Sequence, residues 1–333
     1  MKYFYPSFHH LHHPSIDLSD GLPGYKHLEE PSRVDQILSG LLQAHECEVV
    51  YVEEYSDELV REIHDDDYVD FLLSISQELK EGEEYIPPVF RDDLSSSPLY
   101  FRGGMYCTEI GTPIGQQSIK AALNSAQTTF KASKDLLEND SSVFVLTRPP
   151  GHHAGKRRYG GYCFFNNSYI AAEYFKKQFK KVVVVDIDYH IGDGSIEFAH
   201  KDAPYFSLHS NTHTNYPYFD AAFKNTNQYV TLDEFQTGID GSVYVQNVKN
   251  LLDKALKVNP EIIILSLGFD TLESDYCQDE YIYVKPDNFA EIGTLFGSLE
   301  QNVLILLEGG YDDNDLGLCA QKFMEGFTQA KGI

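Results

Sequence analysis

Three residues with metal-binding side chains, Asp186, Asp188 and His190, stand at positions i, i+2 and i+4 after an apolar run. In an extended segment this spacing directs all three side chains to one side. Two carboxylates and an imidazole suit zinc, and a catalytic zinc site uses three protein ligands and leaves a fourth position open. Asp270 follows a later apolar run and could be the third ligand beside Asp188 and His190. Alternatively, aspartates after strands act only as helix caps or turn residues.

Two adjacent histidines, His152 and His153, lie in a turn flanked by proline and glycine. They lack the i, i+4 spacing of metal ligands on a helix, so they suit proton transfer better. An imidazole near an activated water can act as general base and then protonate the leaving amine, provided that a carboxylate orients it. Asp186 and Asp193 are available as that partner.

Tyr311 follows two glycines, which let the backbone bend tightly and present the phenol to a site. Its hydroxyl could donate a hydrogen bond to an oxyanion. The alternative is a packed core tyrosine, since the chain has 23 tyrosines.

The elements that must position these residues read as an α/β protein with a parallel sheet buried on both faces. Buried strands are predicted at residues 143–146, 182–185, 262–267 and 303–307, weaker ones at 2–5, 49–52 and 205–208, and amphipathic helices at 116–138 and 242–257. Each of the first four runs ends in glycine mixed with His, Asp, Glu or Tyr. Ligands bind outside the carboxyl ends of parallel strands, so these four tails are predicted to meet at one site.

The charge balance limits the partners. The 333 residues include 51 acidic and 26 basic ones, a formal net charge of −25, which argues against nucleic acid or an anionic membrane and favours cationic ligands. The five cysteines are scattered without a C-x-x-C pair, which argues against a disulfide framework. No window is apolar enough for a membrane span, and the first residues do not form a secretory signal. A cytoplasmic protein is therefore predicted.

The segment 85–118 is rich in Pro, Gly and Ser and follows neither the helix nor the strand period. A loop that long inside a domain is usually functional or disordered. Because α/β alternation continues after it, we predict one domain over 1–333 with a long inserted loop.

Together these motifs resemble the zinc-dependent histone deacetylase superfamily, and more closely its acetylpolyamine amidohydrolase branch. The matching stretches are RPPGHHAG (148–155), GGYCFFNN (160–167), VDIDYHIGDG (185–194), SLH (207–209), SLGFDTLESD (266–275) and LEGGYD (307–312). The resemblance spans nearly the whole chain. It implies an arginase/deacetylase fold, a single α/β domain around an eight-stranded parallel sheet.

By motif position, the resemblance implies that Asp188, His190 and Asp270 hold one catalytic zinc ion. It implies that His152 and His153 are the catalytic histidine pair, with His153 the general base and acid.

The resemblance also gives roles to residues around this centre. Tyr311 matches the tyrosine that polarises the scissile carbonyl. Asp186, Ser207 and Leu208 match a structural site for potassium.

Tyr162 and Tyr216 match the walls of an acyl-lysine tunnel, and Gly161 is expected to bind substrate with them.

Two departures from the family pattern stand out. Ile191 replaces the usual second histidine, and the run around Tyr216 reads YPYFD (216–220) instead of a proline-glycine run. The first puts local hydrogen bonding in doubt, and the second predicts a tunnel wall of different shape.

The implied reaction is zinc-dependent hydrolysis of an acetylated primary amine to acetate and free amine. In acetylpolyamine amidohydrolases the segment similar to 85–118 lies at a dimer interface and narrows the site to slender molecules. We therefore expect a homodimer that acts on acetylpolyamines, with Asp92, Asp93 or Glu109 near the distal ammonium of the substrate. These three could instead be solvated surface charges.

Three alternatives stay open. One is a deacetylase for acetyl-lysine in proteins or peptides, and another is a two-metal ureohydrolase like the arginases. The third is a catalytically silent module that binds acetylated amines, which an intact Tyr311 and His153 make improbable.

Overall fold

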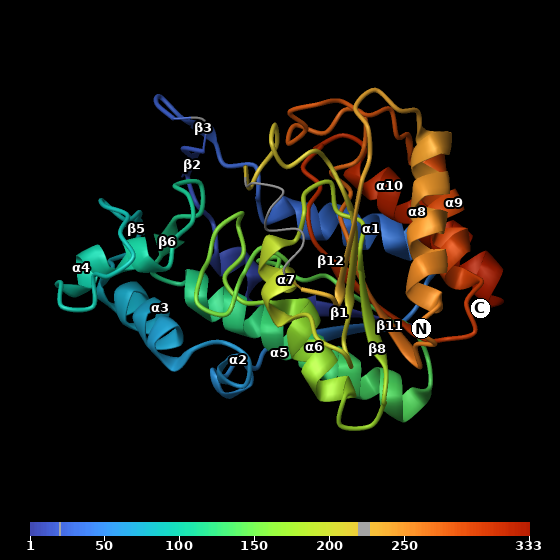
Figure 1. Ribbon diagram of the computed structural model, residues 1–333, viewed down its shortest axis with the longest axis horizontal. Coiled ribbons are helices and arrows are strands. Elements are labelled where there is room, and N and C mark those ends of the chain that lie inside the picture. The colour runs from blue at the N-terminus through green and yellow to red at the C-terminus, as the bar shows by residue number, and fades with distance from the viewer. Residues whose placement is uncertain (20, 219–226) are drawn as a thin grey trace.

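Eight parallel strands form the central sheet of the computed structural model, which describes residues 1–19, 21–218 and 227–333 (Figure 1). Their order across the sheet is β10 (Val230–Glu234), β9 (Tyr205–His209), β8 (Val182–Asp186), β11 (Ile262–Leu267), β12 (Val303–Leu307), β7 (Val143–Val145), β1 (Lys2–Pro6) and β4 (Val49–Val52). The predicted eight-stranded parallel sheet is confirmed, and the seven runs singled out in the sequence match strands to within one residue at each end.

The strands are apolar throughout because both faces of the sheet are covered. On β8, Val183 and Val185 join one hydrophobic core, whereas Val182 and Val184 join the other. All four side chains are fully buried. This explains why the strands read as continuous apolar runs rather than as alternating patterns.

Helices pack on both faces of the sheet (Figure 1). One core contains side chains from α1 (Ser32–Ala44), α8 (Gly241–Leu256), α9 (Pro286–Gly297) and α10 (Leu316–Lys331). The opposite core contains side chains from α5 (Ser118–Asn139), α6 (Asn167–Phe175) and α7 (Asp193–Phe198). The two helices predicted from periodicity are α5 and α8. None of the described helices is long and apolar enough to span a bilayer.

The predicted inserted loop is closed at its base by a short antiparallel ribbon. Glu84–Tyr85 (β5) pairs with Ile114–Gly115 (β6), so the two ends of the excursion lie side by side. Between them are α4 (Leu99–Arg102) and a 3₁₀ turn, η2 (Gly103–Met105). The remaining short elements are η1 (His9–Leu11), α2 (Glu58–Arg61), α3 (Asp66–Glu78), and the ribbon of β2 (Ile16–Asp17) and β3 (Tyr25–Lys26).

The four strands that end in chemically active residues are neighbours in the sheet. Their order is β8, β11, β12 and β7, and all run in the same direction. Their carboxyl ends therefore deliver the four polar tails to one place, as the sequence predicts.

Candidate active site

The predicted metal ligands lie together where two paired strands end. Asp188 and His190 follow β8, and Asp270 follows β11. One ligand atom from each residue lies within 4.8 Å of the other two. His190 Nδ1 is 3.2 Å from Asp270 Oδ2 and 3.4 Å from Asp188 Oδ1.

The environment of this cluster suits a divalent cation. The Asp188 and Asp270 side chains are fully buried. Burial and the neighbouring Asp188 carboxylate raise the pKa of Asp270, because two anions share one dry site. A cation between them would remove that repulsion and let both groups ionise. Two carboxylates and one imidazole are a donor set that zinc accepts, with a fourth position left open.

Backbone groups fix the orientation of these ligands. Asp188 Oδ1 accepts the His190 N–H at 2.9 Å, and Asp188 Oδ2 accepts the Gly309 N–H at 2.8 Å. A Cβ atom at residue 309 would lie 2.4 Å from Asp270 Oδ2, so only glycine allows this approach. Gly310 adopts a φ of +118°, which other residues rarely adopt. Gly309 therefore allows the close approach to Asp270, and Gly310 allows the tight bend before Tyr311 that the sequence predicts.

Each of the paired histidines faces its own carboxylate. His152 Nδ1 is 3.1 Å from Asp186 Oδ2, and His153 Nδ1 is 2.7 Å from Asp193 Oδ1. Both predicted partners are therefore in place, one for each ring. Because a carboxylate only accepts hydrogen bonds, each Nδ1 carries the proton and each Nε2 is left for other chemistry.

The pKa values of the two histidines shift in opposite directions. Burial and the neighbouring His152 lower the pKa of His153 to about 4, so His153 is neutral at neutral pH. Burial alone would lower the pKa of His152 too, but the Asp188 and Asp186 carboxylates outweigh it and raise that pKa. A neutral imidazole can accept a proton, which makes His153 the candidate general base.

Arg158 holds the carboxylate partner of His153. Its guanidinium donates to Asp193 Oδ2 and, at 2.9 Å, to the Asp193 carbonyl oxygen. Burial would raise the pKa of Asp193, but Arg158 and His153 outweigh it and lower the pKa to about 2. Asp193 is therefore ionised at neutral pH.

Tyr311 is nearly buried and lies beside the histidine pair in the lining of one pocket. The Arg33 guanidinium lies 4.5 Å from the centre of its ring, and Tyr162 meets the ring edge-on at 5.7 Å. Asp275 Oδ2 accepts the N–H groups of Tyr311 and Asp312 at 2.6 and 3.1 Å. Asp275 ends the SLGFDTLESD run, but no local sequence pattern indicates this role.

The pocket opens to solvent and has a cavity volume of about 130 Å³. Its lining within the described residues is Ser19, Tyr25, Leu28, Glu109, His152, His153, Gly161, Tyr162, Asp188, His190, Tyr216, Tyr218, Tyr276, Cys277, Asp279 and Tyr311. The predicted wall residues Tyr162, Tyr216 and Gly161 are all present. The Tyr216 ring meets His153 edge-on at 4.8 Å, and the Tyr162 hydroxyl donates to Asp17 at 2.5 Å.

The acidic residues predicted to meet the substrate lie in different places. Glu109 lines the pocket, but its carboxylate already accepts hydrogen bonds from the Gly111 and Gly161 backbone and from the Thr112 hydroxyl. Asp92 and Asp93 are exposed and are not among the residues that line the pocket of their own chain.

The residues matched to a potassium site also come together in part. Asp186 and Ser207 are register partners on β8 and β9. The Tyr205 hydroxyl donates to Asp186 Oδ2 at 2.6 Å. The Leu208 side chain is buried in the core on one face of the sheet.

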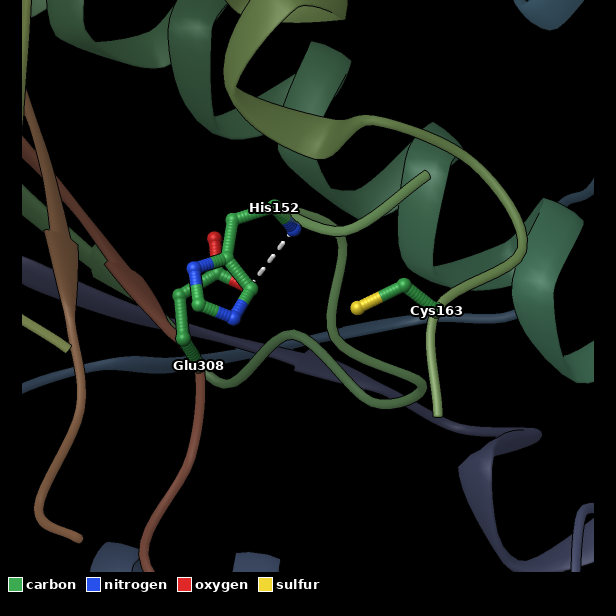
Figure 2. Close-up of side chains that lie close together, drawn as sticks. All are labelled: His152, Cys163 and Glu308. Atoms are coloured by element: carbon green, nitrogen blue, oxygen red, sulfur yellow. Dashed lines mark hydrogen bonds between the residues drawn. The ribbon is translucent and has the colours of Figure 1, made fainter. Parts of the chain in front are cut away.

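Figure 2 shows a second group of potential ligands, His152, Cys163 and Glu308. His152 Nε2 is 3.7 Å from Asp188 Oδ1 of the first group. Glu308 Oε2 accepts the backbone N–H groups of Gly151 and His152 at 2.8 and 3.2 Å, and Oε1 accepts the Ser266 hydroxyl at 3.0 Å. Glu308 therefore holds the histidine turn. The two groups share no residue.

One of the two departures from the family pattern, Ile191, has a local explanation. The Ile191 side chain is fully buried in the core beside α6 and α7, where an apolar residue packs well. In the run around Tyr216, Tyr216 and Tyr218 line the pocket, whereas Phe219 and Asp220 lie outside the described residues.

Comparison with known proteins gives a consistent result. The histone deacetylase domain matches residues 27–327. Acetylpolyamine amidohydrolase 2 of Pseudomonas aeruginosa is 30% identical, covering 98% of both chains. A polyamine deacetylase of Homo sapiens is 29% identical over 85% of this chain and 42% of its own. The crystal structure of an acetylpolyamine aminohydrolase from Burkholderia pseudomallei superposes with a TM-score of 0.91 at 26% identity, covering 99% of each chain.

Proposed function

Because the chain belongs to the histone deacetylase family, we propose that it hydrolyses acetylated polyamines to acetate and free amine. The observation that carries the proposal is the cluster of Asp188, His190 and Asp270. Its donor atoms lie within 4.8 Å of one another, and Asp188 and His190 line one pocket with His153 and Tyr311. That arrangement combines a metal site, a base and an oxyanion donor, as amide hydrolysis requires.

Asp188, His190 and Asp270 would hold one zinc ion. The chemistry that zinc supplies when bound is polarisation of the acetyl carbonyl and activation of a water molecule. With three protein ligands, a zinc ion bound there would leave room for water or substrate, and Asp188 and His190 both line the pocket.

His153 moves the proton. Its Nδ1–H is bonded to Asp193, so Nε2 accepts the proton of the attacking water and then gives it to the leaving amine. His152 is held in place through its Nδ1 by Asp186. Tyr311 donates its hydroxyl to the oxyanion of the tetrahedral intermediate, at a backbone position that Asp275 fixes.

Tyr162, Tyr216 and Gly161 form the walls around the acetylated amine. Slender aliphatic amines suit aromatic walls, and the net charge of −25 favours a cationic substrate. The relatives with similar sequences are named for polyamine substrates.

The test compares kcat/KM on N-acetylputrescine and acetylspermine with that on an acetyl-lysine peptide. We expect higher values on the acetylpolyamines. A preference of tenfold or more for the peptide would overturn the polyamine assignment and favour a protein deacetylase. No release of acetate from any of these substrates by the zinc-loaded protein would overturn the deacetylase assignment itself.

We further propose a homodimer through segment 85–118. Phe90, Tyr100 and Phe101 on this segment expose 38%, 54% and 39% of their surfaces, and exposed apolar residues near one another favour association. In such a dimer, Asp92 and Asp93 could approach the partner's pocket. Light scattering should give twice the chain mass for the wild type and the single-chain mass for Phe101→Asp. A monomeric wild type would contradict the proposal.

Potassium is proposed at Asp186, Ser207 and Leu208, supported by the register pairing of Asp186 with Ser207. A shift of the melting temperature when sodium replaces potassium at constant ionic strength would test it. We place the protein in the cytoplasm, which agrees with its five free cysteines.

A further inference from the structure

Arg158 joins two segments that carry catalytic groups. It ends a tight turn over residues 155–158, directly after the histidine pair. Its guanidinium donates to Asp193 and Glu197, the first and fifth residues of α7. Arg158 is not among the described residues that line the pocket. Any effect that it has on the reaction must therefore pass through another residue.

The turn and the helix fit together closely. The Gly155 N–H donates to the Arg158 carbonyl oxygen at 3.0 Å, which closes the turn. A Cβ atom at residue 155 would lie 2.7 Å from both Arg158 Nε and Glu197 Oε1, so only glycine leaves room for this approach. The Ser195 N–H donates to the His152 carbonyl oxygen at 3.0 Å and ties α7 to the histidine pair. The Arg158 guanidinium therefore lies in a rigid frame.

This frame fixes the carboxylate of Asp193. Arg158 donates to Asp193 Oδ2, to the Asp193 carbonyl oxygen at 2.9 Å and to Glu197 Oε1 at 2.5 Å. The Asp193 side chain is only 3% exposed, and its Oδ1 lies 2.7 Å from His153 Nδ1. One oxygen of the carboxylate thus accepts from Arg158, and the other faces His153.

The two neighbours of Asp193 differ in what they can do. An arginine has only donors, whereas the Nδ1 atom of a neutral histidine either donates or accepts, according to its tautomer. A carboxylate accepts from both neighbours at once. A side chain with a single acceptor at position 193 would have to give it to Arg158 or to His153. The tautomer of His153 therefore depends on Arg158 as well as on Asp193.

We propose that Arg158 is a positioning residue for the hydrolysis. It holds Asp193 so that His153 keeps its proton on Nδ1 and presents a free Nε2 to the reacting atoms. This inference rests on the proposed function, in which His153 moves the proton.

The decisive experiment adds a second substitution to Asp193→Asn in the zinc-loaded full chain. In Asp193→Asn, Arg158 takes the carboxamide oxygen and His153 is left with the wrong tautomer. Arg158→Met removes the competing donor, so in the double variant the carboxamide oxygen can turn and accept from His153 Nδ1. We expect kcat on N-acetylputrescine to be at least about fivefold higher in the double variant than in Asp193→Asn, with similar KM, which is part of the roughly 10²–10⁴-fold that acid–base catalysis contributes. A gain below fivefold would overturn the inference.

Single substitutions at the two adjacent arginines provide the matched comparison. Arg158→Met should lower kcat by about tenfold, which is about the value of one hydrogen bond, and should change KM less than twofold. Arg158→Lys keeps the charge and should restore part of that loss. Arg157→Met is the control, because Arg157 is 45% exposed and donates to Asp67 instead, and it should keep kcat within about twofold of the wild type. Wild-type kcat in Arg158→Met would contradict the positioning role.

NMR spectra of ¹⁵N-histidine-labelled protein read the tautomer without any turnover. The signals of His153 are identified by their loss in His153→Gln. The proton should be on Nδ1 in the wild type, on Nε2 in Asp193→Asn and again on Nδ1 in the double variant. A proton on Nε2 in the double variant would overturn the inference. If the wild type releases no acetate, the proposed function fails, but these spectra still decide whether Arg158 sets the tautomer.

Discussion

Replacing Asp193 with asparagine tests the role of His153 through a single hydrogen bond. In the wild type, Asp193 Oδ1 accepts from His153 Nδ1 at 2.7 Å, and Arg158 donates to Oδ2. Arg158 has only donors, so it turns the carboxamide oxygen of the variant toward itself. The amide NH₂ then faces His153 Nδ1, which must lose its proton to accept. The proton moves to Nε2, and the imidazole can no longer act as base there.

The expected loss follows from that change of tautomer. General acid–base catalysis contributes roughly 10²–10⁴-fold to rate, so kcat/KM of Asp193→Asn should fall by about that factor, or about 3–5 kcal/mol. The loss of kcat/KM should persist as the pH rises. At every pH above its pKa the His153 imidazole of the variant is neutral and keeps its proton on Nε2, so raising the pH does not restore a base there.

The assay is acetate release from N-acetylputrescine between pH 5 and 9, together with the zinc content and melting temperature of each variant. Glu197→Gln is the matched control. Glu197 is the other carboxylate bound to Arg158, at 2.5 Å, yet it has no contact with His153. It should keep kcat/KM within about threefold. A folded, zinc-loaded Asp193→Asn with activity within threefold of the wild type would refute the reasoning.

Three further predictions concern groups around the site. Tyr311→Phe should keep zinc and ligand binding but lose kcat by at least about 10², and near-normal turnover would discredit the oxyanion role. Asp275→Asn should lower kcat about tenfold with little change in KM, because an amide oxygen replaces the carboxylate that accepts two backbone N–H groups. A change in melting temperature without a change in kcat would argue that Asp275 does not position Tyr311. Burial lowers the pKa of His64 to about 4. The folded chain therefore binds fewer protons there than the unfolded chain between pH 4 and 6.5, and wild-type stability falls as pH drops through that window. Denaturant titrations measure the difference in unfolding free energy between wild type and His64→Gln. This difference should shrink by about 3 kcal/mol from pH 7 to pH 4. A constant difference would contradict a neutral buried His64.

The sequence predicts the sheet well where strands are buried on both faces. The edge strand β10 was missed because its residues, VTLDE, are polar and only half-buried, with a neighbour on one side alone. An edge strand of this kind carries little periodic signal.

Residues close in sequence at a strand end are also predictable. Asp188 and His190 need only one strand to bring them together, and the adjacent strand β11 adds Asp270. The hydrogen bond of Glu308 to Gly151 joins residues 157 positions apart, and that of Asp275 to Tyr311 joins residues 36 apart. No local pattern specifies such pairs.

The most direct test of the account is to locate the metal. Metal analysis of the purified chain, with anomalous diffraction at the zinc edge, should find one zinc ion bound by Asp188, His190 and Asp270 at about 2.0–2.2 Å from their ligand atoms. Removal by a chelator should abolish acetate release, and added zinc should restore it. Two manganese ions per chain, or a zinc ion bound away from these three side chains, would contradict the account.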